Sequence, residues 1–106
     1  MRVTAKRMLR EFWDRFPATR APLQDWHRQT EAANWRKPSE VKATFGRADV
    51  MTINGKHAIV FDILENRYRL ITTVTYSSAF RGGVVYTREI LTHKEYDAEQ
   101  WKRRIG

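Results

Sequence analysis

The hydrophobic pattern of the chain changes period near its middle, and this change limits the possible folds more than any other feature. Over residues 4–16 the apolar side chains recur at the three- and four-residue spacing of a helix face: Met8, Leu9, Phe12, Trp13 and Phe16. From residue 49 onward, the apolar residues come in short runs rich in valine, isoleucine and threonine, which favour strands. A helical half followed by a strand-forming half predicts an α+β fold, with one domain over residues 1–106.

Helices are expected at three places in the first half. The first covers residues 4–16, where Thr4 is suited to cap the start and Phe16-Pro17 ends the helix. The second begins after Ala21-Pro22, and a short helical turn runs from Ser39 to Phe45. The large aromatic residues of this half are expected to fill the core rather than to contact a ligand: Trp13, Phe16 and Trp26.

The second half predicts a four-stranded antiparallel sheet. Asn54-Gly55 separates two apolar runs, 49–53 and 56–63, and this dipeptide is a strong hairpin signal because both residues tolerate a positive φ. Two further strands are expected over 68–76 and 84–91, joined by a loop that contains a pair of glycines. The expected order is N-terminal helices, then the sheet, then a short C-terminal helix.

That last helix is predicted to begin at His93. Thr92 and Glu95 have the spacing of a capping box, in which each side chain accepts a hydrogen bond from the other residue's backbone amide. Three cations are expected near the C-terminal end of the helix, where positive charge favours the helix dipole: Lys102, Arg103 and Arg104. Contact with RNA would explain the same cluster equally well.

The charge balance favours a polyanionic partner. Twenty Lys and Arg residues against 12 Asp and Glu residues give a formal net charge of +8 and a pI near 10.3. A surplus of this size in so short a chain is typical of proteins that bind nucleic acids. A solvated basic surface, or a positive face that matches an acidic protein partner, would give the same balance.

The residue types exclude several kinds of chemistry. The sequence contains no cysteine, so disulfides, thiolate zinc sites and cysteine nucleophiles are all excluded. His27, His57 and His93 lack a metal-binding spacing, and no acidic cluster is suited to hold a pair of cations. We therefore expect no metal and no cofactor. A charged first segment and the lack of a long apolar run favour an unprocessed cytoplasmic protein, with no membrane partner.

Three residues could carry metal-free RNA cleavage, which needs a base, an acid and a cation beside the phosphate. His93 lies at an expected helix N-terminus, where the dipole disfavours imidazolium and free amides can bind phosphate. Tyr96 lies three residues on and shares its face. Arg69 interrupts an apolar strand, so its guanidinium must reach water or a partner. The simpler alternatives are that His93 only caps the helix and that Tyr96 closes the edge of the core.

Further cations lie in the strand half. Arg88 interrupts the last strand, where a cross-strand ion pair with Glu89 is the simpler alternative. Lys56 and His57 follow the hairpin turn, where they could bind phosphate or be merely solvated.

Segments 59–63, 66–71 and 85–97 resemble HigB-type toxins of the RelE/ParE superfamily. The most specific pieces are the Tyr68-Arg-Leu step and Thr92-His-Lys-Glu-Tyr-Asp97. The resemblance implies a RelE-like fold of helices on an antiparallel sheet. It also implies an mRNA endonuclease that works on the translating ribosome. The expected protein partner is a HigA-type helix-turn-helix antitoxin encoded next to it.

The resemblance also implies roles for individual residues. Arg69 would contact the scissile phosphate, His93 would carry acid–base or charge-stabilising chemistry, and Tyr96 would position or protonate the substrate. The residues expected to bind RNA are Lys56, His57, Arg67, Arg88 and Lys94. The chain departs from its relatives at Asp62, where they often have asparagine, and at Glu65, where they often have glycine.

Three functions follow from the sequence. The first is a ribosome-dependent mRNA endonuclease in which the 2′-hydroxyl attacks its own phosphate. The second is a non-catalytic module that binds RNA or an antitoxin through its basic surface, and the third is a gyrase-directed toxin on the same fold. The intact Thr92-His93…Tyr96 segment favours cleavage over the other two.

Overall fold

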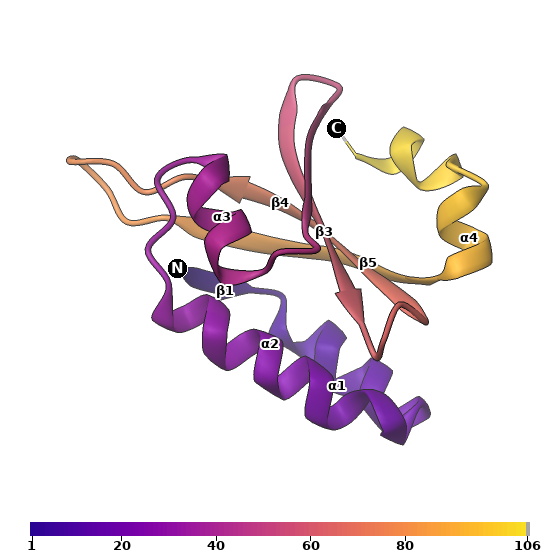
Figure 1. Ribbon diagram of the computed structural model, residues 1–106. Coiled ribbons are helices and arrows are strands. Elements are labelled where there is room, and N and C mark those ends of the chain that lie inside the picture. The colour runs from indigo at the N-terminus through magenta and orange to yellow at the C-terminus, as the bar shows by residue number, and fades with distance from the viewer. Residues whose placement is uncertain (106) are drawn as a thin grey trace.

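A five-stranded sheet lies at the centre of the protein, whose computed structural model describes residues 1–105 (Figure 1). The strand order is β1-β5-β4-β3-β2, with β1 parallel to β5 and all other neighbours antiparallel. The strands are β1 (Arg2–Thr4), β2 (Asp49–Ile53), β3 (Lys56–Ile63), β4 (Tyr68–Thr75) and β5 (Val84–Thr92). The α-helices are α1 (Lys6–Arg15), α2 (Arg20–Ala32), α3 (Pro38–Thr44) and α4 (His93–Asp97), and two 3-10 helices are η1 (Pro17–Thr19) and η2 (Gln100–Arg104).

The antiparallel part of the sheet agrees closely with the sequence. β2 and β3 have the predicted bounds, and the Asn54-Gly55 turn between them has φ values of 51° and 77°. β4 ends one residue earlier than predicted and β5 ends one residue later. The start of α4 at His93 is confirmed, and the capping box of Thr92 and Glu95 is present.

The prediction was wrong at the first residues, and the sheet has one strand more than expected. Arg2–Thr4 form β1 beside β5, and Thr4 pairs with Tyr86 instead of capping a helix. α1 begins only at Lys6, after Ala5 in a left-handed conformation. A strand of three residues is too short to give a recognisable alternation, so no periodic signal could reveal it.

Two further boundaries differ from the prediction. α2 begins at Arg20, so Pro22 lies inside its first turn, where the missing amide hydrogen removes no intrahelical bond. α4 ends at Asp97, and the three cations of the tail lie in the separate helix η2. The expectation that those cations belong to the last turn of α4 was therefore wrong.

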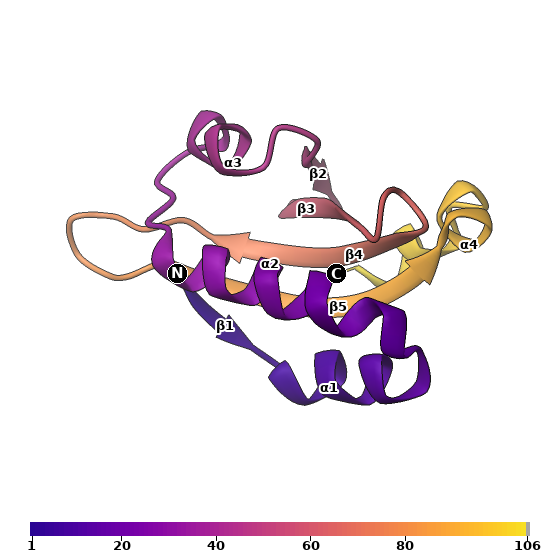
Figure 2. The same cartoon turned by 60° about the horizontal axis from the view of Figure 1, so that its bottom comes forward.

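The two faces of the sheet are covered differently. One face packs against α1, α2 and α3, and its core includes Leu23, Trp26 and Phe61. On the other face, Trp101 and Ile105 of the C-terminal segment pack against a smaller apolar cluster that includes Ile71. In both ribbon views α4 lies at one end of the sheet, and the β4–β5 loop projects from the opposite end (Figure 2).

The aromatic residues expected in the core have different fates. Trp26 is 2% exposed, which confirms the prediction, and Trp13 is half-buried. Phe16 is 38% exposed and lies beside Phe12 and Tyr68 at the surface, so its assignment to the core was wrong. The helical spacing places Phe16 on the apolar face of α1. The helix ends at Arg15, however, and Phe16 is left partly exposed at its end.

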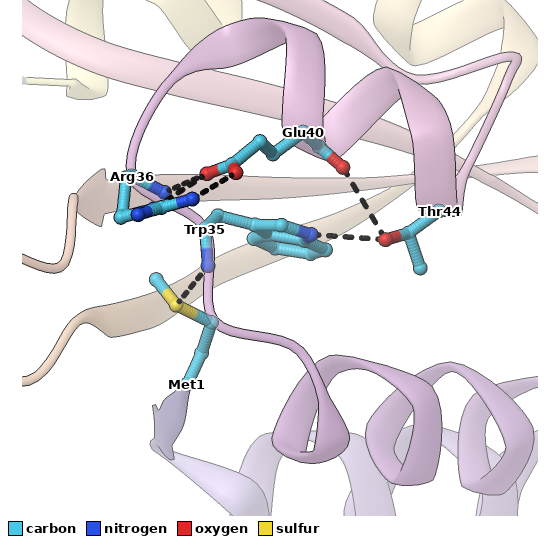
Figure 3. Close-up of polar contacts among 5 residues, drawn as sticks. All are labelled: Met1, Trp35, Arg36, Glu40 and Thr44. Atoms are coloured by element: carbon cyan, nitrogen blue, oxygen red, sulfur yellow. Dashed lines mark hydrogen bonds and ion pairs between the residues drawn. The ribbon is translucent and has the colours of Figure 1, made fainter.

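α3 is held against the core through Trp35, which lies three positions before the first residue of the helix, Pro38. The Trp35 backbone amide donates to Met1 Sδ at 3.2 Å, and its indole N–H donates to the Thr44 hydroxyl at 3.0 Å (Figure 3). Arg36 and Glu40 add an ion pair of 3.0 Å at the start of the helix. Trp35 is 1% exposed, so these contacts close the α3 side of the helix-covered face.

Candidate functional site

Arg69 lies near the start of β4 and is 8% exposed. Its sheet neighbour on β3 is Asp62, and its Nε lies 3.3 Å from Asp62 Oδ1. Its Nη1 donates to the carbonyl oxygens of Asn66 at 2.9 Å and Tyr68 at 3.4 Å. The guanidinium therefore meets partners within the protein, which is one of the two outcomes expected from the sequence.

Tyr96 lies directly beside Arg69. The Arg69 Cζ is 5.4 Å from the centre of the Tyr96 ring, within the range of a cation–π contact. Trp101 stacks on Tyr96 at 5.3 Å with 16° between the ring planes, and its indole N–H donates to the Tyr96 carbonyl at 3.0 Å. Burial raises the pKa of the Tyr96 phenol, Asp49 raises it further, and Arg69 opposes this. The phenol therefore holds its proton at neutral pH.

His93 is the first residue of α4, and its side chain is 53% exposed. Its Nδ1 lies 2.9 Å from Asp97 Oδ2, one helical turn on. The capping box fixes the start of the helix, because the Thr92 amide donates to Glu95 at 3.0 Å and the Glu95 amide donates to Thr92 at 3.2 Å. These bonds also lower the pKa of the Glu95 carboxyl. The ring of His93 is thus oriented by a carboxylate and open to solvent.

A second cluster surrounds Arg88 further along the same strands. The β4–β5 register shifts between Ile71 and Thr72, so Ile71 faces Glu89 and Thr72 faces Thr87, with Arg88 as the extra residue of β5. Such a bulge re-aims a side chain. Here the exposed Arg88 donates from Nε to the Thr73 hydroxyl at 3.1 Å. The cross-strand ion pair with Glu89 does not form, because Glu89 binds Arg104 at 2.8 Å.

A groove of about 340 Å³ lies beside Arg88. It is lined by Gly55, Lys56, His57, Thr73, Val74, Thr75, Tyr86 and Arg88. No acidic residue is among these lining residues, so the charge of Arg88 and Lys56 is not neutralised within the groove. The Arg88 Cζ also lies 5.8 Å from the centre of the Tyr86 ring, which adds a second restraint on the guanidinium.

The predicted residues thus form two groups on one face of the sheet. Arg69 and Tyr96 form the first, with His93 on the same helix as Tyr96, and Lys56 and Arg88 line the second. His57 borders the same groove, but strand alternation turns its ring to the helix-covered face, where it lies 5.7 Å from the centre of the Tyr76 ring. Arg69 and Thr73 are four positions apart along β4, or roughly 13 Å at about 3.3 Å per residue. Both positions point to the same side because side chains alternate along a strand.

Arg67 and Lys94 belong to neither group. Both are exposed, and within residues 1–105 neither side chain makes a hydrogen bond or ion pair. Sequence reasoning also missed three residues that organise the site: Thr73, Tyr86 and Trp101. Strand alternation places Thr73 on the Arg69 face, but no local pattern indicates that Trp101 returns to Tyr96.

Two general features complete the description of the site. Within the part of the chain that the structure describes, no three histidine, cysteine or acidic side chains gather as a potential metal site. No helix among residues 1–105 combines the length and apolar character needed to cross a membrane.

Comparison with known proteins finds one family over most of the chain. Residues 19–99 match the HigB toxin family, described as the RelE-like toxic component of a toxin–antitoxin system. The mRNA interferase toxin HigB of Escherichia coli strain K12 is 28% identical over 97 residues, which cover 92% of this chain and 88% of that protein. The mRNA interferase HigB of Shigella flexneri has the same identity and coverage.

Proposed function

This chain belongs to the HigB family of RelE-like toxins, and from that premise we propose that it is a metal-independent endoribonuclease acting on mRNA at the ribosome. The curated relatives carry the activity of an mRNA interferase in their names. The observation that carries the proposal is the face of the sheet away from α1–α3. There, a basic groove without acidic lining residues and the Arg69–Tyr96 pair lie on the same side of the sheet.

We assign the binding of the RNA backbone to the groove around Arg88. Thr73 holds the Nε of Arg88, so the outer guanidinium nitrogens remain available for a bidentate contact with phosphate. Lys56 supplies a second positive charge from the start of β3. Because the guanidinium is already oriented, it loses little conformational freedom when the phosphate binds.

The cleavage step is assigned to the α4 end of the same face. The 2′-hydroxyl attacks the adjacent phosphorus and loses its proton to a base, and the 5′-oxygen leaves with a proton from an acid. Asp97 holds Nδ1 of His93, so Nε2 is the nitrogen that can exchange a proton with the RNA. Tyr96 retains its proton at neutral pH and is suited to protonate the leaving oxygen. The products are a 2′,3′-cyclic phosphate and a 5′-hydroxyl.

Arg69 has a different role in this scheme from the one that the family resemblance implies. Arg69 is 8% exposed, and its guanidinium is already bound to Asp62 and to the Asn66 carbonyl. We therefore propose that Arg69 orients Tyr96 and supplies positive charge beneath it, while Arg88 makes the direct contact with phosphate.

The proposed partners follow from the same family. A toxin of a toxin–antitoxin system requires an antitoxin, and we propose a HigA-type helix-turn-helix protein encoded beside it. The cytoplasm is the proposed place of action, because translated mRNA is the proposed substrate. Co-purification of the product of the neighbouring reading frame tests the partnership.

Induction in growing cells tests the proposed function. We expect the His93→Ala and Arg69→Ala variants to fold but to lose growth arrest, because each removes a group that the cleavage step uses. His27→Ala is the matched histidine control, since His27 lies on α2 and contacts Glu31. Purified protein added to translating ribosomes should cleave the bound mRNA, because mRNA at the ribosome is the proposed substrate. Full toxicity in both site variants would overturn the site assignment.

The burial of Arg69 favours one alternative, a module that binds RNA without cutting it. Such a module needs the Arg88 groove but not a reactive group at α4. It predicts RNA binding that weakens steeply with salt, because bound phosphates release counterions, and no new RNA ends. The assay with purified protein and translating ribosomes separates the two functions.

A further inference from the structure

We propose that Trp101 is a positioning residue for Tyr96, and that the Asn54 side chain holds in place the segment that carries Trp101. This inference rests on the proposed function, because it assumes that Tyr96 takes part in cleavage. It assigns a role to two residues that lie outside the predicted site. It also means that the hairpin turn between β2 and β3 helps to position Tyr96 through the C-terminal segment.

The need for such a support follows from the size of α4. The helix has five residues and none of them is fully buried. A helix this short has no stability of its own in water, so its position depends on capping and on tertiary contacts. The capping box fixes its first turn, but it does not fix the helix against the sheet.

Trp101 supplies the missing contact. It is 1% exposed and lies in an apolar cluster on the face of the sheet away from α1, α2 and α3, called the open face from here on. The cluster includes Ile71 and Leu91 of the sheet. From there it touches Tyr96 twice, through the stacked rings and through the hydrogen bond from its indole N–H to the Tyr96 carbonyl. Both the ring and the backbone of Tyr96 are therefore set by one anchored residue, with Arg69 beside the ring.

Asn54, in the turn between β2 and β3, anchors the same segment. Its side-chain amide donates to the Lys102 carbonyl at 3.2 Å and to the Ile105 carbonyl at 2.6 Å. These two bonds join residues about 50 positions apart in the chain. One bond reaches the middle of η2 and the other the residue after its end, so they restrain the part of the segment that follows Trp101.

The protein offers a matched control within its own core. Trp35 is also 1% exposed and also donates its indole N–H at 3.0 Å, but to Thr44 on the opposite face of the sheet. Trp35→Phe and Trp101→Phe remove the same kind of hydrogen bond and leave an aromatic ring. Any difference between them in activity reflects what the tryptophan positions, and not the loss of a buried bond as such.

The variants of choice keep the fold. Trp101→Phe retains part of the stacking, and Trp101→Leu removes it. Asn54→Gly removes the amide, and glycine tolerates the φ of 51° at this position. We expect kcat for RNA cleavage to fall by at least about tenfold in Trp101→Leu and Asn54→Gly, because misplacement of a catalytic group by about 1 Å can cost about 100-fold. KM should stay the same, and Trp101→Phe should recover part of the loss.

The second measurement does not depend on cleavage. NMR of protein with labelled tyrosine reports the ring of Tyr96 and its pKa, which now reflects burial together with Asp49, Arg69, Lys102 and Asp62. Trp101→Leu and Asn54→Gly should shift these signals, and Trp35→Phe should not. The proposal is overturned if the signals stay unchanged, or if kcat falls equally in Trp35→Phe. A wild-type protein that cuts no RNA contradicts the proposed function instead, and the NMR result still decides whether Trp101 positions Tyr96.

Discussion

The two faces of the sheet come from the same strands but bury different chemistry. On the face that α1, α2 and α3 cover, Trp26, Trp35 and Phe61 form an aromatic core with ring centres 5.3 to 6.1 Å apart. On the opposite face, charged groups stand beside apolar ones, and a partner holds each of two arginines: Asp62 holds Arg69 and Thr73 holds Arg88. Strand alternation therefore sends the Phe61 ring of this core to one face of the sheet and the two arginines of the proposed site to the other.

If the helix-covered face provides the stability, its central ring should be the most sensitive position. Phe61 is 2% exposed and contacts Trp26, Trp35 and Phe45. We expect Phe61→Ala to lower the free energy of unfolding by about 3–5 kcal/mol, because a large buried side chain leaves a cavity. Urea denaturation followed by circular dichroism measures the loss. A change below 1 kcal/mol would remove the distinction between the faces.

If the open face provides the chemistry, Arg88 should affect activity without affecting stability. We expect Arg88→Ala to weaken RNA binding, and with it activity at low RNA concentration, by about 10–100-fold, because a hydrogen bond to a charged group contributes about 1.5–3 kcal/mol. Unfolding should change by less than about 0.5 kcal/mol, since the residue is exposed. Arg7→Ala on α1 is the matched control, because Arg7 is an exposed arginine bound only to Glu11. Equal activity in the two variants would contradict the assignment of the groove.

Asp62 sharpens the comparison, because it places a negative charge on the open face. Asp62→Asn keeps an acceptor for Arg69 but removes the charge-assisted contact of 3.3 Å. We expect a loss of about 1–2 kcal/mol in stability, the difference between hydrogen bonds with and without a charged partner. We also expect tighter binding of single-stranded RNA, as the face becomes more positive. Unchanged affinity in a filter-binding assay would show that RNA avoids the Arg69 end.

The smallest effect is expected at the turn between β3 and β4, which lies at the Arg69 end of the sheet. Leu64, Glu65 and Asn66 have positive φ values of 54°, 50° and 79°. A side chain in this region costs about 1–2 kcal/mol, so Glu65→Gly should raise stability by about 1 kcal/mol. Glu65→Ala is the control and should bring no gain, because alanine has the same steric restriction. A gain in both variants would point to the charge of Glu65 and not to its backbone.

Local signals in the sequence predicted most of the antiparallel sheet. The Asn54-Gly55 turn set the register of β2 and β3, and the Thr92–Glu95 spacing set the start of α4 to the residue. β1 was not predicted because its three residues form a strand only by pairing with β5, more than 80 positions away. The end of α4 was misjudged for a related reason, since η2 depends on tertiary contacts of Trp101 and Asn54.

The site was predicted residue by residue but not as an arrangement. Chemistry and family resemblance identified Arg69, His93, Tyr96 and Arg88, yet the bulge that aims Arg88 at Thr73 has no local signature. Asp62 was noted as a departure from relatives, and only the cross-strand register reveals it as the partner of Arg69. Their roles in cleavage remain predictions.

Mapping of RNA ends tests the central claim most directly, that this chain cleaves mRNA by attack of the 2′-hydroxyl. Total RNA is sequenced after brief induction of the wild-type protein and of His93→Ala, with chemistry that distinguishes 5′-hydroxyl from 5′-phosphate ends. The account predicts new 5′-hydroxyl ends within coding sequences for the wild type, paired with 2′,3′-cyclic phosphates, and none for His93→Ala. Growth arrest without such ends, accompanied by DNA damage, would contradict it and favour a gyrase-directed toxin.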